Sequence, residues 1–281
     1  MLACCQTVFA AGQLYRVTHE GKTSYLYGTI HVGRDGAYPL DAVASRALLD
    51  SKALVIELDI REDKAFQLAL ARHGRYPDGD SVQNHLTPAA LQKTVDALAR
   101  AGIPLASVQH YKPWLIANLL VGAELDRNGY QRSQAVEYAL LAAAQKQDKT
   151  VRELESADYQ LSLFDSLDEH QQEQYLLENL TDLDDGDSLK RSAALIEAWR
   201  AADDTGIQAA WRTATTGDSI SAGFMNRVLL GKRNPEMAAN IERIMQQDQV
   251  AFVGVGLLHL VGDDGLPQLL KRRGYDVEQL Y

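Results

Sequence analysis

Short apolar runs at both ends of this chain frame a long middle region with a different pattern. Two strand-like apolar segments, 14–19 and 23–30, flank residues 19–22, which carry the Gly that a tight turn favours, and this predicts a β-hairpin. Apolar runs at 53–58, interrupted by Glu57, and at 250–255 predict two buried strands. The chain therefore begins and ends with sheet-forming segments.

Between about residues 62 and 248 the apolar positions recur mostly with helical spacing. Pro88 follows Thr87, whose hydroxyl is placed as an N-cap, and Pro113 opens another helix. The pattern predicts helices at 40–49, 88 onward, 114–124, 136–147, 157–166, 170–180, 188–202, 235–247 and 266–273, short strands at 150–155 and 276–280, and an acidic loop at 182–187.

These elements predict an α/β fold with a mixed central sheet built from the N- and C-terminal segments and a large, mostly helical middle region. Residues 1–11 stand apart by composition, and 12–281 are expected to form a single domain. Its α/β core would comprise 12–60 and 249–281, and its helical lobe about 61–248.

Composition limits the classes of function. The chain has 281 residues, of which 46% are hydrophobic and 23% charged, as in ordinary globular proteins. A net charge of -10 argues against nucleic-acid binding, which needs a basic face. No apolar run approaches the length of a membrane span. The two cysteines, Cys4 and Cys5, are neighbours, so the body offers no disulfide framework, cysteine zinc site or cysteine nucleophile.

The first residues are small, apolar and uncharged. Val8-Phe9-Ala10 approximates the small-residue rule of a signal-peptidase site, so residues 1–11 are interpreted as the end of a secretory signal. This interpretation predicts a periplasmic or secreted protein. A lipobox remnant at Met1-Leu2-Ala3-Cys4 and an unstructured cytosolic N-terminus are the alternatives.

Two Gly-x-x-His turns, each at the end of a predicted strand, are the strongest chemical signal. The first runs from Gly28 to His31, and the second from Gly256 to His259. A glycine lets the backbone turn sharply or approach a ligand closely, and an imidazole binds metals or acts as a base near pH 7. Each histidine alone is more often structural, but the pair at two strand ends indicates one site.

Glu57 is the third candidate, because a carboxylate that follows Ala53-Leu54-Val55-Ile56 is costly unless it is paired, hydrated or bound to a cation. If strands 25–30 and 53–58 are neighbours, Glu57 lies near His31. Two histidines and a glutamate are the protein ligands of many hydrolytic zinc sites. The alternative is a carboxylate simply exposed at a strand end.

Three further residues could contribute. Arg233 and Asn234, in the predicted turn Lys232-Arg233-Asn234-Pro235, could clamp a carboxylate or orient an oxyanion. Glu155 ends a strand candidate and could support the site as a second carboxylate or a base. Surface exposure and helix capping are the alternatives for all three.

These residues and their surroundings resemble the TraB/GumN (TraB/PrgY/GumN) family. The similarity is carried by Tyr25-Leu26-Tyr27-Gly28-Thr29-Ile30-His31-Val32, Val55-Ile56-Glu57-Leu58, Lys112-Pro113-Trp114, Leu154-Glu155 with Gln160, Lys232-Arg233-Asn234, and Val253 to Gly262 continuing through Tyr275-Asp276-Val277. Members often carry Gly-Val-Asp before the mid-chain helix, where this chain has Ala135-Val136-Glu137, keeping the acid without the glycine.

The resemblance implies a core like that of the erythromycin esterases and the ChaN proteins. It also implies a metal-dependent hydrolase, a peptidase as proposed for the Tiki proteases, in which His31, Glu57 and His259 bind a divalent ion. Arg233 would stabilise the oxyanion, and Glu155, Asn234, Gly28 and Gly256 would support the site. Imidazole and carboxylate do not choose among manganese, cobalt and zinc.

Two other functions stay open. A metal-free esterase would use His31 or His259 as base with Glu57 as its partner. A haem- or signal-binding protein would show no turnover at all. The expected partner is a peptide or small-molecule substrate, and a homodimer through the apolar helix 114–124 is an alternative to burying that helix in the core.

Overall fold

The computed structural model describes residues 11–34, 40–61, 63–248 and 250–281. The strands are β1 (Leu14–His19), β2 (Lys22–Thr29), β3 (Ala53–Ile56), β4 (Thr150–Glu153), β5 (Ala251–Gly256) and β6 (Asp276–Gln279). The helices are α1 (Ala42–Asp50), α2 (Asp63–His73), α3 (Pro88–Arg100), α4 (Leu105–Val108), α5 (Pro113–Arg127), α6 (Val136–Lys146), α7 (Ala157–Asp165), α8 (Glu169–Asp184), α9 (Asp187–Arg200), α10 (Asp204–Thr215), α11 (Ile220–Phe224), α12 (Arg233–Asp248) and α13 (Leu266–Arg272), with short η segments at Val82–Asn84, Arg132–Gln134, Met225–Leu230 and Leu257–Leu260.

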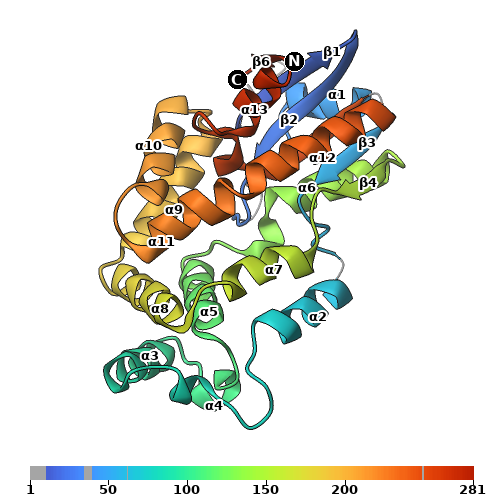
Figure 1. The fold of residues 1–281 in the computed structure, drawn as a ribbon. Coiled ribbons are helices and arrows are strands. Elements are labelled where there is room, and N and C mark those ends of the chain that lie inside the picture. The colour runs from blue at the N-terminus through green and yellow to red at the C-terminus, as the bar shows by residue number, and fades with distance from the viewer. Residues whose placement is uncertain (1–10, 35–39, 62, 249) are drawn as a thin grey trace, which may run out of the picture.

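The strands form one six-stranded sheet in the order β4-β3-β5-β2-β1-β6. Strand β5 pairs in parallel with both β2 and β3, and β3 pairs in parallel with β4. Strand β1 pairs antiparallel with β2 and β6, so the sheet is mixed. This confirms the predicted α/β class with its mixed central sheet, and Figure 1 shows the sheet at one end of the molecule with the helical region below it.

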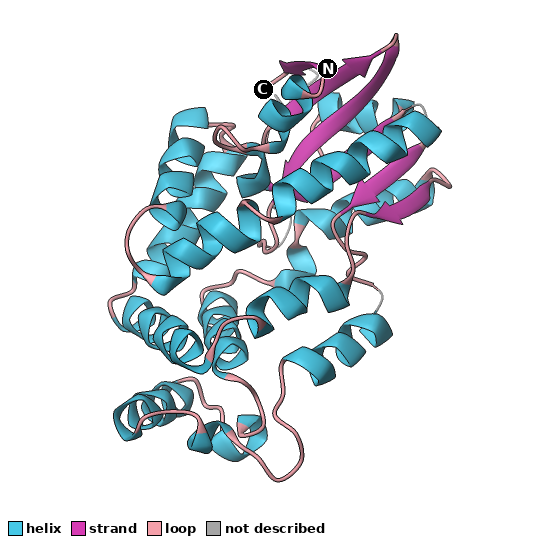
Figure 2. Ribbon diagram, viewed as in Figure 1, coloured by secondary structure: helices cyan, strands magenta, loops and turns pink. Residues whose placement is uncertain are grey.

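Helices cover both faces of the sheet, as Figure 2 shows. Tyr27, Ile56 and Phe252 point to the face that packs on α1, α6 and α9, whereas Leu26, Val55 and Val253 point to the face covered by α12 and α13. Because successive side chains of a strand alternate between faces, a strand buried on both sides reads as a continuous apolar run. This explains the uninterrupted hydrophobic stretches in β3 and β5.

The helical region has its own core, away from the sheet. Ile116 and Leu120 of α5 pack with Leu98 of α3 and Leu176 of α8 in a separate hydrophobic cluster. Trp114 is fully buried in another, against α2 and α7. The apolar helix at 114–124 is therefore buried within the chain, as its sequence predicts for a core helix, and does not need a second copy to cover it.

The structure corrects the expected neighbours in the sheet. Strands β2 and β3 do not pair with each other, because β5 lies between them. Strand β4 comes from the middle of the chain and still joins the sheet beside β3. A parallel pair is formed by segments far apart in sequence, so local patterns do not determine which strand lies between two others.

Two local expectations are also wrong, and one helix was not assigned individually. The acidic segment 182–187 is not an extended loop, because α8 runs to Asp184 and α9 begins at Asp187, which leaves only a turn at 185–186. Helix α10 was not predicted, since Gly206 and several threonines obscure its pattern, although Asp203 caps it. The expected turn at 232–235 is helical from Arg233 onward.

The interpreted secretory signal lies almost wholly outside the described residues. Cys4, Cys5 and Val8-Phe9-Ala10 all precede residue 11, so secretion stays a prediction from the sequence. Within the described ranges, each helix is either too short or too polar to cross a membrane.

Candidate functional site

The carboxyl ends of four parallel strands bring the candidate residues to one edge of the sheet. In spatial order, β4 leads to Glu155, β3 to Glu57, β5 to Gly256 and His259, and β2 to His31. Ligands of open α/β sheets bind at this edge, where loops leave the strands. The sequence-predicted residues from both ends of the chain therefore lie together.

His31 stands at the rim of the cluster, where its imidazole is anchored from one side. Its Nδ1 lies 2.6 Å from Oε1 of Glu137, and the same oxygen accepts a 2.6 Å hydrogen bond from the Thr29 hydroxyl. Glu137 is buried, whereas the His31 side chain is 68% exposed. The charge of Glu137 raises the pKa of the His31 imidazole to about 9, in a position open to solvent.

Glu57 lies at the centre of the cluster, and both of its carboxylate oxygens accept hydrogen bonds. Its Oε1 accepts the backbone N–H of Gly256 at 2.5 Å, and its Oε2 accepts Nη2 of Arg233 at 2.5 Å and Nε2 of Gln160 at 3.4 Å. Burial tends to raise the pKa of this carboxyl, but in the acid range where it titrates the charges of His259, Arg233 and His31 and the Gly256 N–H outweigh burial and lower the pKa to about 2. Glu57 is therefore an ionised carboxylate despite its burial.

Arg233 joins two carboxylates in the buried wall of the site. Its Nε lies 3.0 and 3.1 Å from the two oxygens of Glu155, and its Nη2 lies 2.6 Å from Oε2 of Glu155. The Arg233 side chain is 9% exposed and that of Glu155 only 3%. Gln160 also donates to Glu155, at 2.9 Å. Arg233 is thus the counter-ion of Glu57 and Glu155 rather than an unpaired group facing the solvent.

His259 is buried, and its tautomer is set by its neighbours. Nδ2 of Asn234 donates to the carbonyl oxygen of Asp264 at 2.8 Å, so the amide presents Oδ1 to Nδ1 of His259, 2.5 Å away. Since that oxygen only accepts, Nδ1 carries the hydrogen and Nε2 keeps a lone pair. Nε2 lies 3.8 Å from Oε1 of Glu57. Burial lowers the pKa of His259 to about 4, which keeps the ring neutral at pH 7.

The two Gly-x-x-His glycines make close approaches of different kinds. A Cβ on Gly256 would lie 3.0 Å from Nε2 of His31 and 3.1 Å from Oε1 of Glu57, so this glycine makes room for the imidazole and the carboxylate. A Cβ on Gly28 would lie 2.6 Å from the Leu257 side chain. Gly28 therefore permits close packing of β2 against the second motif.

Sequence reasoning passed over three residues of the cluster. Glu137 was noted only as the acid of a segment that lacks the glycine found in many family members. Its side chain nevertheless reaches His31. Gln160 bridges Glu57 and Glu155, and Thr29 shares the Glu137 oxygen. The signal for Gln160 was its place in the family pattern after Glu155, whereas nothing local marked Thr29.

The cluster has an electrostatic preference for cations. Three carboxylates, Glu57, Glu137 and Glu155, are balanced by the Arg233 guanidinium and, at neutral pH, by the protonated His31, which leaves one negative charge because His259 is neutral. Over the described residues, however, no three His, Cys, Asp or Glu side chains are arranged as a metal site. The imidazoles offer two nitrogen ligands, while Glu57 is held by Arg233.

Comparisons with known proteins agree with this description of the chain. It is 25% identical over 257 residues to the uncharacterized protein YbaP of Shigella flexneri and 25% identical over 256 residues to YbaP of Escherichia coli K12. The first match covers 88% of both chains, and the second covers 88% of this chain and 87% of YbaP. No solved structure matches the chain. The model of the TraB/PrgY/gumN family matches residues 13–279, and the chain belongs to this family.

Proposed function

We propose that the cluster is the active site of a hydrolase that cleaves peptide bonds. The observation that carries the proposal is the orientation of the imidazoles. His31 and His259 each contact an acceptor oxygen through Nδ1, which leaves Nε2 of each ring for other chemistry. Nε2 of His259 has a lone pair near Glu57, whereas Nε2 of His31 carries a proton at neutral pH and would bind a cation only after losing it. Histidines that bind metals or activate water are typically held in this way.

The chain's own residues can be given roles in this reaction. Nε2 of His259 has a lone pair toward Glu57 and would orient or deprotonate a water molecule at that carboxylate. His31, exposed at the rim, would meet the substrate first. Arg233 keeps Glu57 ionised and in place. The peptide as substrate rests on the resemblance to the Tiki proteases, a relation that the comparisons do not test.

A divalent cation is part of this proposal. Nε2 of His259, Nε2 of His31 once a cation displaces its proton, the carboxylate of Glu57 and the net negative charge of the cluster are the chemistry that manganese, cobalt or zinc would use. When bound, such a cation lowers the pKa of its water toward neutrality. His31, His259 and Glu57 would hold it, and Glu57 would have to share Oε2 with Arg233 or bind through Oε1.

A metal-free hydrolase, such as an esterase, is a second candidate, favoured by one specific observation. His259 has a neighbour at each ring nitrogen, with Asn234 fixing Nδ1 and Glu57 lying 3.8 Å from Nε2. This arrangement positions a general base without any further ligand. In this version Glu57 stabilises the imidazolium that forms when His259 accepts the proton of the attacking water.

Measuring hydrolysis of a peptide library with and without a chelator tests the proposal and separates the two versions. We expect chelation to abolish hydrolysis and added Mn²⁺, Co²⁺ or Zn²⁺ to restore it. Hydrolysis that is unchanged after chelation, in protein shown to contain no transition metal by elemental analysis, would favour the metal-free version. If neither peptides nor esters are cleaved under any metal loading, the chain is not the hydrolase proposed here.

Replacing Gly256 by alanine should slow hydrolysis without unfolding the protein. The new Cβ would meet His31 and Glu57 at 3.0 and 3.1 Å, so both groups must move by some tenths of an ångström. Misplacing reacting groups on the ångström scale costs up to about 10²-fold in rate, and we expect a loss of roughly 10- to 100-fold. The measurements are the hydrolysis rate and the thermal unfolding curve.

Gly122→Ala is the matched control, because a Cβ there meets nothing within 4 Å. This variant should keep full activity. A G256A protein as active as the G122A protein would show that the close approach at Gly256 has no role in the reaction.

A further inference from the structure

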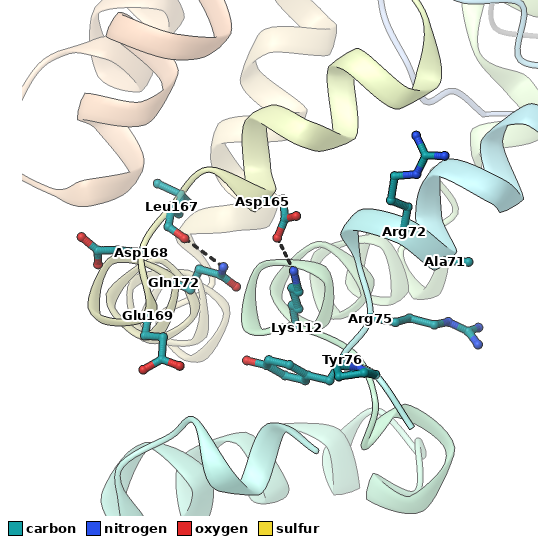
Figure 3. Close-up of a pocket in the computed structure, with 11 residues that line it drawn as sticks. Ala71, Arg72, Arg75, Tyr76, Lys112, Asp165, Leu167, Asp168, Glu169 and Gln172 are labelled. Atoms are coloured by element: carbon teal, nitrogen blue, oxygen red, sulfur yellow. Dashed lines mark hydrogen bonds and ion pairs between the residues drawn. The ribbon is translucent and has the colours of Figure 1, made fainter. Parts of the chain in front are cut away.

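A polar pocket lies in the helical region, outside the cluster at the sheet edge. It has a volume of about 750 Å³ and is formed by the end of α2 with the residues that follow it, the start of α5, and the junction of α7 and α8 (Figure 3). Pockets of this size hold small organic ligands. None of its lining residues belongs to the proposed hydrolytic site.

The charges that line this pocket cancel in number but are separated in space. Three cations face three carboxylates, which sum to zero in a chain whose net charge is -10. The cations are Arg72, Arg75 and Lys112, and the carboxylates are Asp165, Asp168 and Glu169. Figure 3 shows both arginines on the α2 side, Asp168 and Glu169 on the α8 side, and the Lys112–Asp165 ion pair between them. The pocket is therefore bipolar.

The acidic side of the pocket has a buried acceptor without a donor. Gln172 is 7% exposed, and its Nε2 donates to the Leu167 carbonyl oxygen at 3.0 Å. Its Oε1 is buried and has no hydrogen-bond partner among the described residues. In Figure 3 this oxygen is directed toward the middle of the pocket. A buried carbonyl oxygen without a partner is costly. Because this oxygen has almost no accessible surface, a ligand donor reaches it only after a small shift of the Gln172 side chain, and the hydrogen bond then formed would be stabilising.

The basic side has a cation available for an anion. Arg75 lies over the Tyr111 ring, 5.1 Å from its centroid, and forms no ion pair with the described residues. Arg72 pairs with Asp158 at 2.8 Å and is 69% exposed. An arginine fork matches a carboxylate in geometry and charge. A carboxylate is therefore the group expected at this side.

One wall of the pocket is held by a ring stack and hydrogen bonds. Tyr76 stacks on His85 with ring centroids 4.0 Å apart, and His85 is held by Asp80 at 2.8 Å and by Glu169 at 2.7 Å. Both bonds fix the imidazole, and the imidazole supports the Tyr76 ring. The pocket is thus preformed on this side, which lowers the entropic cost of binding a ligand.

We propose that this pocket binds a small zwitterion of the amino-acid or short-peptide class. The ammonium group would donate to Oε1 of Gln172 on the acidic side, and the carboxylate would meet Arg75 on the basic side. The volume accommodates a dipeptide. Asp165 lies only five residues beyond Gln160 on α7, about 7.5 Å along the helix axis, so the pocket neighbours the hydrolytic cluster without sharing its residues.

Titration calorimetry with one dipeptide in three forms tests the proposal. The probes are alanyl-alanine, its N-acetyl derivative and its C-terminal amide, each added to the full chain carrying H31A and H259A so that turnover cannot interfere. We expect alanyl-alanine to bind and each blocked form to bind at least about tenfold more weakly, since each has lost one charged hydrogen-bonding group. Equal binding of all three forms, or no binding at millimolar concentration, would overturn the proposal.

Two variants locate the binding site in the same background. Arg75→Gln should weaken the binding of alanyl-alanine about tenfold and leave the binding of its C-terminal amide unchanged. Gln172→Leu should weaken the binding of alanyl-alanine by a similar factor and leave the binding of the N-acetyl form unchanged. Arg46→Gln, an exposed arginine paired with Asp50 on α1, is the matched control and should bind as the parent does. If R75Q and Q172L bind all three probes as R46Q does, the ligand sits elsewhere and the assignment is wrong. Since binding is measured without turnover, this outcome is independent of whether the chain is a hydrolase.

Discussion

Removing both imidazoles should abolish hydrolysis, with a smaller loss for each single change. The H31A and H259A variants each lose a nitrogen that faces Glu57, and a positioned base or metal ligand contributes roughly 10²–10⁴-fold to a rate. His31 is 68% exposed on its side chain, so its removal should leave stability almost unchanged. His259 is buried, so its removal opens a small polar cavity. The measurement is the hydrolysis rate beside the thermal unfolding curve.

The design of this experiment keeps catalysis and folding apart. His170→Ala, an exposed histidine on α8, is the matched control and should keep full activity. Added imidazole should restore part of the H259A rate, because the ring can re-enter the vacated space beside Asn234. Full activity of the H31A/H259A double variant would contradict every version of the proposed mechanism.

Replacing Arg233 by methionine should have the largest effect on stability. Glu57 and Glu155, whose side chains are 12% and 3% exposed, both depend on Arg233 for their positive partner. Its removal leaves two buried carboxylates facing each other, and breaking a buried ion pair from one side costs about 3–5 kcal/mol. We expect the free energy of unfolding in urea to fall by about this amount at neutral pH.

A second change should recover much of the loss. In the R233M/E155Q double variant, Glu57 is the one carboxylate left of the two that Arg233 binds. The repulsion between the two carboxylates is therefore removed. The matched control is R46M, where an exposed arginine loses a 2.9 Å pair with Asp50 and the unfolding free energy should change by no more than about 0.5 kcal/mol. If R233M is as stable as R46M, the buried network does not hold the site together.

Much of the local structure could be predicted because its causes are local. The hairpin β1–β2 follows from two apolar strand-like segments on either side of Gly21, and α3 follows from Thr87 and Pro88, which cap and open it. A buried strand identifies itself by its continuous apolar run, as β5 does. Where the local signal was mixed, as in α10 with its internal Gly206, prediction failed.

Part of the site could also be predicted. His31 and His259 stood out because each follows a glycine at the end of a predicted strand, and Glu57 because a carboxylate beside a buried strand is costly unless it is paired or hydrated. Glu137 carried no such mark, since an acid in the first turn of a helix is ordinary, and its 2.6 Å contact with His31 joins residues 106 positions apart. Arg233 was noticed for a different role, because a sequence does not show which carboxylates surround a guanidinium.

The sequence alone determined that this protein has buried strands near both ends, a helical middle region, and a histidine behind a glycine at two strand ends. Only the tertiary structure decided that β5 lies between β2 and β3, so that Gly256 separates His31 from Glu57 and makes room for both. It also decided that Arg233 binds Glu57 and Glu155, and that Asn234 sets the tautomer of His259. The physical reason is range: turns, caps and strand burial depend on neighbouring residues, whereas sheet order and buried charge pairing depend on which distant segments pack together.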